Sequence, residues 1–201
     1  ILQGMAATGL VACAGGGDTA ATSGDGGHGD DTGADDMGAL PGTPAADGFA
    51  MPAEWEPHAG CLMQFPPPTN YCADGVTDCS FIERARAEWA DVARTIARFE
   101  PVVLYAAPAD AALARKLCGS DVTVVEAELS DGWSRDTGPI LVRDAGGLVR
   151  ASCFAFNGWG GSVEYAADAL IKWRMAADLG VQTYDHPMVL EGGAVIVDGT
   201  G

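Results

Sequence analysis

An abrupt change in composition at residue 49 is the feature that most constrains how this chain can fold. Residues 1–48 contain seven Asp residues but no Lys, no Arg and no aromatic residue. Every Trp and Tyr of the 201-residue chain comes after Phe49. A segment rich in Gly, Ala, Thr and Asp buries too little apolar surface to offset the entropy of ordering it. We therefore predict a disordered acidic linker over residues 14–48 and a folded part over residues 49–201.

Residues 1–13 have the character of a truncated export signal. The segment is mildly apolar, contains no basic residue and ends in Leu10, Val11, Ala12 and Cys13. That ending resembles a bacterial lipobox, where a signal peptide is cut and the following cysteine is acylated. We therefore predict that Cys13 carries lipid and holds an exported domain at a membrane surface of the cell envelope. The alternative interpretation is an accidental tetrapeptide.

The charge of the chain excludes several classes of partner. The chain carries 28 acidic and 11 basic side chains, which gives a formal net charge of −17 at pH 7. Such a polyanion repels nucleic acid and anionic lipid headgroups. The bias suits cationic partners, although acidity alone more often serves solubility. We therefore predict no nucleic-acid partner, and membrane contact only through Cys13. No run of about 18 apolar residues occurs, so no membrane-spanning helix is predicted.

The six cysteines fit an oxidising compartment in part. Cys72 and Cys79 bracket a short polar loop that closes easily, so they are the candidate disulfide. A zinc site is the weaker alternative, because neither cysteine has a second ligand at a typical spacing. The other three cysteines of the folded part stand in apolar surroundings and are predicted to be buried thiols: Cys61, Cys118 and Cys153.

Apolar periodicity in the folded part alternates between helix and strand. A capping box at 80–83 opens an amphipathic helix, whose predicted buried face is Ile82, Ala85, Trp89, Val92, Ile96 and Phe99. Two more helices are predicted over 109–117 and, closed by Gly180, over 164–179. The predicted strands are 102–105, 122–125, 140–142, 148–156, 181–184, 188–190 and 194–197. The fold class is therefore α/β, and its mixture of hairpins and crossovers argues against a simple doubly wound sheet.

Polar side chains that could bind a ligand or take part in catalysis concentrate in three glycine-containing loops, each next to a predicted strand. The loops are WSRDTGP at 133–139, FNGWGG at 156–161 and LEGG at 190–193. Glycines of this kind let the backbone approach a ligand closely. Alone, each loop has an ordinary structural explanation, such as a buried Arg135–Asp136 pair or a glycine-driven turn.

A fourth motif, MPAEWEPH at 51–58, opens the folded part and makes the set specific. The four motifs, the last extending to LEGGAVIVDGTG at 190–201, resemble in order those of the N-terminal half of the agmatine deiminase and bacterial peptidyl-arginine deiminase family. This resemblance covers nearly all of residues 49–201. It implies the five-bladed α/β propeller of guanidine-modifying enzymes. We take the 55 residues from Asp136 to Glu191 as the length of about one blade. The folded part would then form about two to three of the five blades.

The resemblance also implies a reaction and its catalytic residues. Members of the family attack the central guanidinium carbon with a cysteine thiolate, release ammonia and hydrolyse the amidino-cysteine; agmatine then yields N-carbamoylputrescine. Asp136 matches the guanidinium-binding carboxylate, Trp133 the aromatic wall, and Glu191 the acid that supports the catalytic histidine. Asn157 and Trp159 would shape the substrate channel, with a purely structural role as the equal alternative. This thiol chemistry requires no cofactor and no metal, and the sequence carries a signature of neither.

Two motifs of the family are missing from the sequence, the histidine motif GHxD and the glycine-rich segment with the nucleophilic cysteine. We therefore expect an incomplete deiminase, inactive alone, whose substrate is agmatine or, as the rival, a peptidyl-arginine. The second hypothesis is a non-catalytic module that binds guanidinium or amine ligands through Asp136 and Glu191. Arg135 is expected to pair within the protein, because a cationic substrate would repel it.

Overall fold

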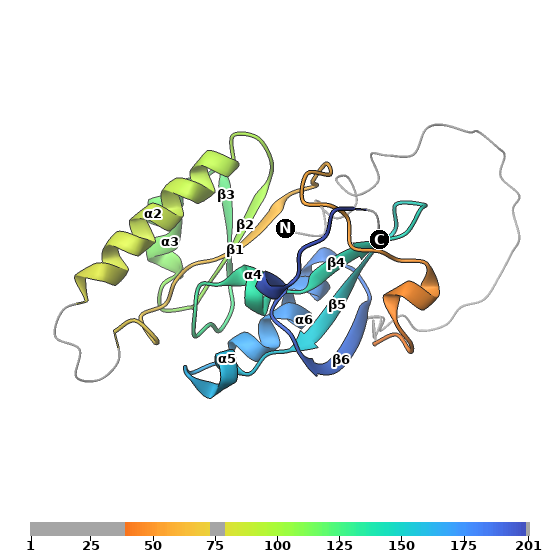
Figure 1. Cartoon of the computed structure of the whole chain (residues 1–201). Coiled ribbons are helices and arrows are strands. Elements are labelled where there is room, and N and C mark those ends of the chain that lie inside the picture. Colours follow the sequence, from red (N-terminus) through yellow and green to blue (C-terminus); the bar gives the residue numbers. More distant parts are fainter. Residues whose placement is uncertain (1–38, 73–78, 200–201) are drawn as a thin grey trace, which may run out of the picture.

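The computed structural model describes residues 39–72 and 79–199, which form two three-stranded sheets connected by helices (Figure 1). The first sheet is parallel, in the order β1 (Cys61–Gln64), β2 (Val102–Ala106) and β3 (Val122–Glu126). The second has the order β4 (Ile140–Arg143), β5 (Val149–Ala155) and β6 (Thr183–Val189), with β4 antiparallel and β6 parallel to β5. The predicted α/β class and its mixture of hairpins and crossovers are confirmed.

The first sheet is covered on one face by α2 (Ser80–Ile96) and α3 (Ala111–Cys118), seen on the left of Figure 1. Every residue of the central strand β2 is buried, and its side chains alternate between the two faces of the sheet. Val102 and Leu104 pack against Ala90 of α2 and Ala114 of α3. Small alanines on both helices allow this close approach of helix to sheet.

Helix α6 (Asp168–Leu179) packs against both sheets. Its Met175 joins the core of Val103 and Tyr105 on the second face of β2. Its Ala176 packs against Ala151 and Cys153 of β5 in the second sheet. One helix thus contributes to two cores and fixes the two sheets relative to each other.

The buried carboxyl group of Asp168, at the start of α6, makes the stability of the fold depend on pH. Its side chain is fully buried; Oδ1 accepts a hydrogen bond from the Ser130 amide at 3.0 Å, and no described residue donates one to Oδ2. Burial is the main cause that raises the pKa of Asp168 to about 6. The folded protein therefore retains this proton between about pH 4 and pH 6, while the unfolded chain loses it.

Asp168→Asn is expected to stabilise the protein relative to wild type above pH 6 and to have little effect near pH 4. The wild-type carboxyl group destabilises the folded state as the pH rises through this window, whereas the amide does not titrate. A shift of about two pKa units corresponds to roughly 3 kcal/mol at neutral pH. Thermal unfolding from pH 4 to 8 measures the difference, with the exposed Asp121→Asn as control. A difference that does not vary with pH contradicts this account.

The folded part begins earlier than predicted. Residues 44–47 form the 3₁₀ helix η1 (Pro44–Asp47), and the Leu40 amide donates to the Thr183 carbonyl at 2.7 Å. The Tyr184 hydroxyl of β6 donates to the Asp47 carboxylate at 2.6 Å. The disordered-linker prediction is therefore wrong for residues 39–48, because polar contacts with β6 order this segment. The rest of the linker, the predicted signal over 1–13 and Cys13 lie outside the described residues.

The buried face of α2 agrees with the prediction in part: Ile82 and Ala85 are buried, and Ile96 packs against the core. Val92 and Phe99 are 51% and 81% exposed, while Arg86 is buried. Arg86 reaches inward because it forms an ion pair with Asp110 at 2.6 Å and donates to the Pro66 carbonyl at 2.8 Å. A partnered arginine, which apolar periodicity did not predict, thus shares the buried face of α2 with Ile82 and Ala85. The helix also begins at Ser80 with Cys79 as its N-cap, so the predicted capping box with Ser80 as cap is wrong.

Three other boundaries differ from the prediction. Helix α6 begins at Asp168 rather than at residue 164, and the segments predicted as 181–184 and 188–190 join in the single strand β6. Residues 194–197 are not a strand: the 3₁₀ helix η2 (Gly192–Ala194) precedes an extended stretch in which Ile196 is 93% exposed. Among the residues that the structure describes, no helix is both long and apolar enough to cross a membrane.

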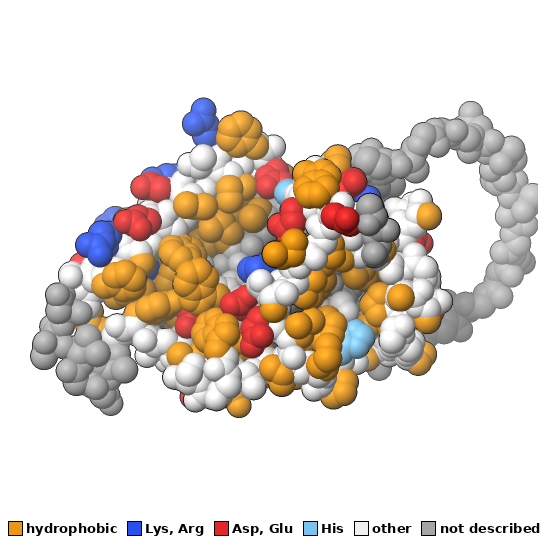
Figure 2. Space-filling view, in the orientation of Figure 1, with side chains coloured by type: hydrophobic (Ala, Val, Ile, Leu, Met, Phe, Trp, Pro, Cys, Tyr) orange, Lys and Arg blue, Asp and Glu red, His pale blue; other side chains and the backbone are white. Residues whose placement is uncertain are grey.

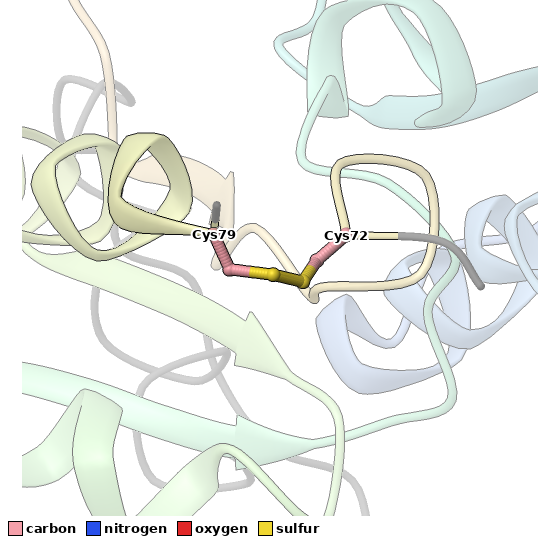
Figure 3. The surroundings of a disulfide bond; sticks show 2 residues. All are labelled: Cys72 and Cys79. Atoms are coloured by element: carbon pink, nitrogen blue, oxygen red, sulfur yellow. A yellow bond between two sulfur atoms is a disulfide. The ribbon is translucent and has the colours of Figure 1, made fainter. Parts of the chain in front are cut away.

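Cys72 and Cys79 form a disulfide bond, with their Cα atoms 5.5 Å apart (Figure 3). The bond joins the turn that follows β1 to the N-terminal end of α2. Of the predicted buried thiols, Cys118 and Cys153 are buried and Cys61 is half-buried. Burial raises the pKa of all three thiols, that of Cys153 to about 12, so none is suited to act as a thiolate nucleophile.

Candidate functional site

The short helix α4 (Ser134–Thr137) lies between the two sheets and carries Asp136 (Figure 1). Its last residue is fixed to the carboxyl end of β1, because the Thr137 hydroxyl donates to Gln64 Oε1 at 2.6 Å and both side chains are fully buried. The Ser134 hydroxyl donates to the Leu62 carbonyl at 3.3 Å. These contacts fix the orientation from which Asp136 projects.

Asp136 is the point at which the three glycine-containing loops meet. Its Oδ2 accepts a hydrogen bond from Trp159 Nε1 at 3.1 Å, and its Oδ1 accepts one from the Gly193 amide at 2.9 Å. The loops that supply these donors follow β5 and β6, which are parallel neighbours, so both emerge at the same edge of the second sheet. A carboxylate accepts about four hydrogen bonds, so two acceptor positions are left for a ligand.

The glycines of the third loop are required by its close approach to α4. A Cβ atom at Gly192 would collide with the Arg135 carbonyl oxygen, and one at Gly193 would collide with Asp136 Oδ1. Neither glycine has a positive φ, so close packing rather than backbone conformation explains both positions. The LEGG motif therefore serves to bring a backbone amide onto the Asp136 carboxylate.

Arg135 pairs within the protein, as predicted from its charge. Its guanidinium group forms an ion pair with Glu54 of the opening motif. The same group donates to the Gly192 carbonyl at 3.2 Å and to the Val195 carbonyl at 3.4 Å. Arg135 thus connects the first and last motifs and contributes to the position of the 191–195 loop.

Trp159 adopts a left-handed backbone conformation, with φ 51° and ψ 52°, in α5 (Gly158–Gly161). This conformation costs roughly 1–2 kcal/mol for a residue with a side chain. The indole bond to Asp136 and an edge-to-face contact with Phe156, at 5.1 Å between ring centroids, offset that cost. In the same turn Asn157 Oδ1 accepts from the Gly160 amide at 2.9 Å, which gives Asn157 a structural role. Its predicted contact with substrate stays a prediction.

Trp133 precedes α4 and presents a half-exposed indole beside the site. Its ring packs edge-to-face on Trp89 of α2, with centroids 5.6 Å apart, and 47% of the residue is exposed. This role of Trp89 was not predicted, because helical periodicity assigned the residue to the buried face of the helix. In the sequence Trp89 is visible only as a tryptophan within an apolar helical stripe, and this does not reveal that it packs against Trp133.

Glu191 lies two residues before Gly193, at the entrance to η2, and is half-buried. The structure gives its carboxylate no hydrogen bond or ion pair with another described residue. The two histidines of the folded part have other partners: His58 pairs with Glu100 at 3.3 Å, and His186 bonds Ser152 at 2.8 Å. Support of a catalytic histidine by Glu191 therefore stays a prediction.

Acidic and hydrophobic side chains lie together in the middle of the face shown in Figure 2, where α4 lies in Figure 1. This mixture suits a ligand that is both flat and cationic. Among the described residues, no group of three or more His, Cys, Asp or Glu side chains is placed to hold a metal ion. A small open pocket lined by Ala127, Ile171 and Arg174, among others, shares no residue with the Asp136 site.

Comparison with known proteins identifies the family. The family model of the Porphyromonas-type peptidyl-arginine deiminases matches residues 50–201. The chain belongs to this family. It is 45% identical over 161 residues to a Streptomyces avermitilis protein that carries a provisional agmatine deiminase name, and 38% identical over 170 residues to the agmatine deiminase of Pseudomonas aeruginosa. Each alignment covers 79% of this chain, and 45% or 44% of the relative.

A solved structure of a family member has the same fold. The agmatine deiminase of Enterococcus faecalis is 30% identical and superposes with a TM-score of 0.71, over 81% of this chain and 45% of that one. The chain therefore spans a little under half the length of the relatives that it matches. The family expected from the four motifs is confirmed, and so is their position in the N-terminal half of its members.

Proposed function

We propose that this chain supplies the guanidinium-binding half of a deiminase that hydrolyses agmatine to N-carbamoylputrescine and ammonia. The observation that carries the proposal is the Asp136 carboxylate, which two N–H donors hold at the meeting point of three loops. A planar guanidinium can donate two parallel hydrogen bonds to the remaining acceptor positions of such a carboxylate. The agmatine deiminase names of the relatives favour agmatine as the substrate.

The proposed chemistry assigns each residue a distinct task. Asp136 orients the guanidinium and makes its central carbon accessible to a cysteine thiolate supplied from outside the 201 residues. The half-exposed indole of Trp133 forms a wall for the flat cation. Glu191 holds a histidine that is likewise supplied from outside. In this proposal the two three-stranded sheets are two of the five blades of a propeller, consistent with the spacing of about 55 residues between Asp136 and Glu191.

Titration of the chain with three ligands tests this function. Agmatine, acetyl-arginine amide as a peptidyl-arginine mimic, and the diamine putrescine are added while the ¹⁵N–¹H resonances of the Trp159 indole and the Gly193 amide are followed. We expect agmatine to shift both resonances and to bind at least tenfold more tightly than putrescine. Tighter binding of acetyl-arginine amide favours the peptidyl-arginine alternative, and equal binding of putrescine favours an amine-binding module. Shifts by none of the three contradict the proposal.

A further inference from the structure

The turn that follows β1 contacts, through one side chain, the segment just before the site's first loop and the segment just after its second. Asn70 Nδ2 donates to the Ser130 carbonyl at 3.0 Å and to Asp131 Oδ2 at 3.1 Å, just before α4. The same amide donates to the Glu164 carbonyl at 3.0 Å, and Asn70 Oδ1 accepts from the Glu164 amide at 3.2 Å, just after α5. Asn70 therefore connects the chain segments that carry Asp136 and Trp159.

The adjacent Tyr71 connects the same turn to Asp131, in the segment that leads into Trp133 and α4. Its hydroxyl donates to Asp131 Oδ1, which also accepts from the Gly132 amide at 2.7 Å. Asp131 is 3% exposed, so its carboxylate depends on these donors. Burial raises the pKa of Tyr71, and the Asp131 carboxylate raises it further. The hydroxyl thus ties the turn to Asp131, two residues before Trp133.

The Cys72–Cys79 disulfide fixes the end of this turn. Cys72 follows Tyr71 directly, and Cys79 is the N-cap of α2, the helix whose Trp89 packs on Trp133 (Figure 3). Asn70 and Tyr71 are thereby held on one side by the disulfide bond and on the other by their hydrogen bonds to the segments next to the site. Sequence alone predicted the disulfide but gave it no connection with the site.

We propose that Asn70 and Tyr71 are positioning residues for the guanidinium site and that the Cys72–Cys79 disulfide holds them in place. The proposal rests on the proposed function, because it is the binding of a guanidinium that the positioning serves. A dithiol that reduces the disulfide transfers two electrons and two protons to the two sulfur atoms; the dithiol becomes a disulfide and the protein gains two thiols. Reduction then loosens the turn and lowers the affinity of the site.

Two substitutions test the positioning role directly. Tyr71→Phe removes only the hydroxyl, and Asn70→Asp replaces the donating amide by an acceptor that repels Asp131. Each is expected to weaken agmatine binding by about tenfold and to shift the indole resonance of Trp159 before any ligand is added. Tyr165→Phe, in a ring that packs edge-to-face on Phe156, removes a hydroxyl for which the described residues provide no hydrogen bond, and it is expected to change affinity less than twofold. Variants that stay folded and keep both the wild-type affinity and the wild-type resonance overturn the proposal.

The disulfide is tested with dithiothreitol and with the double variant Cys72→Ser/Cys79→Ser. Reduction of the wild-type chain, verified by counting free thiols, is expected to lower agmatine affinity three- to tenfold. The double variant is expected to start at the lower affinity and to show no response to dithiothreitol. Unchanged affinity after complete reduction contradicts the role of the disulfide. If the chain does not bind agmatine, the proposed function fails, but the ligand-free indole resonance of Trp159 still tests the positioning.

Discussion

Asp136→Asn is expected to weaken agmatine binding by roughly 100-fold. The substitution removes the negative charge that a guanidinium pairs with, and loss of one partner of a hydrogen-bonded charge pair costs about 2–5 kcal/mol. It also turns one acceptor oxygen into a donor, which then faces the N–H of Trp159 or of Gly193. Isothermal titration calorimetry with agmatine measures the loss, and thermal unfolding shows whether the variant is folded.

Asp121→Asn is the matched control for this experiment. Asp121 is an exposed carboxylate directly before β3, so its substitution changes the net charge by the same amount away from the site. We expect its affinity for agmatine to stay within twofold of wild type. Equal weakening by both variants would mean that the overall negative charge of the protein, rather than the Asp136 carboxylate, attracts the ligand.

Gly193→Ala is expected to weaken agmatine binding by ten- to 100-fold. The added methyl group occupies the space of Asp136 Oδ1, so either the loop or the carboxylate must move. Either movement breaks the bond from the Gly193 amide and disturbs the orientation set by Trp159. Because Gly193 has no positive φ, alanine fits its backbone conformation and the effect is steric. Overpacking of this kind also costs about 1–3 kcal/mol of stability, measurable by chemical unfolding.

Gly146→Ala controls for the substitution itself. Gly146 lies in the β4–β5 hairpin, also without a positive φ, and its added Cβ would lie 3.3 Å from the carboxylate tip of Asp144. Asp144 is half-buried and its Oδ1 accepts a hydrogen bond from the Leu148 amide at 2.8 Å, so the adjustment that the added Cβ requires falls on contacts within this hairpin. We expect wild-type affinity from this variant. Wild-type affinity from Gly193→Ala as well would show that the amide contact with Asp136 is dispensable.

Much of the architecture could be predicted because the signals are local. Pro101 and the run of apolar residues that follows it indicate the buried strand β2, and Gly180 ends α6 with the φ of 68° that a glycine adopts readily. The burial of Arg86 on α2 was not predicted, because its partners Pro66 and Asp110 lie on other segments of the chain, which helical periodicity does not contain. Likewise, the order of residues 39–48 depends on contacts with β6, more than 130 residues further along the chain.

The site shows the same division between local and distant information. Its carboxylate and glycines were recognisable as motifs, because each motif is a short continuous segment. The contacts that hold these residues in place could not be recognised, because the partners are far apart in the sequence: Asn70 and Asp131 are separated by 61 residues, and Trp159 and Asp136 by 23. Nothing in the sequence around Asn70 distinguishes it from an ordinary turn residue. Such long-range hydrogen bonds become visible only when the fold brings their partners together.

The packing of α6 against both sheets has a consequence for biosynthesis. Val103 and Tyr105 of the first sheet have their second face covered by Met175, a residue of the segment that follows β5. While a ribosome is still translating the region between β3 and α6, that apolar face is open to water. A nascent chain at this stage is at risk of aggregation, and the risk ends only when α6 has left the exit tunnel and docked.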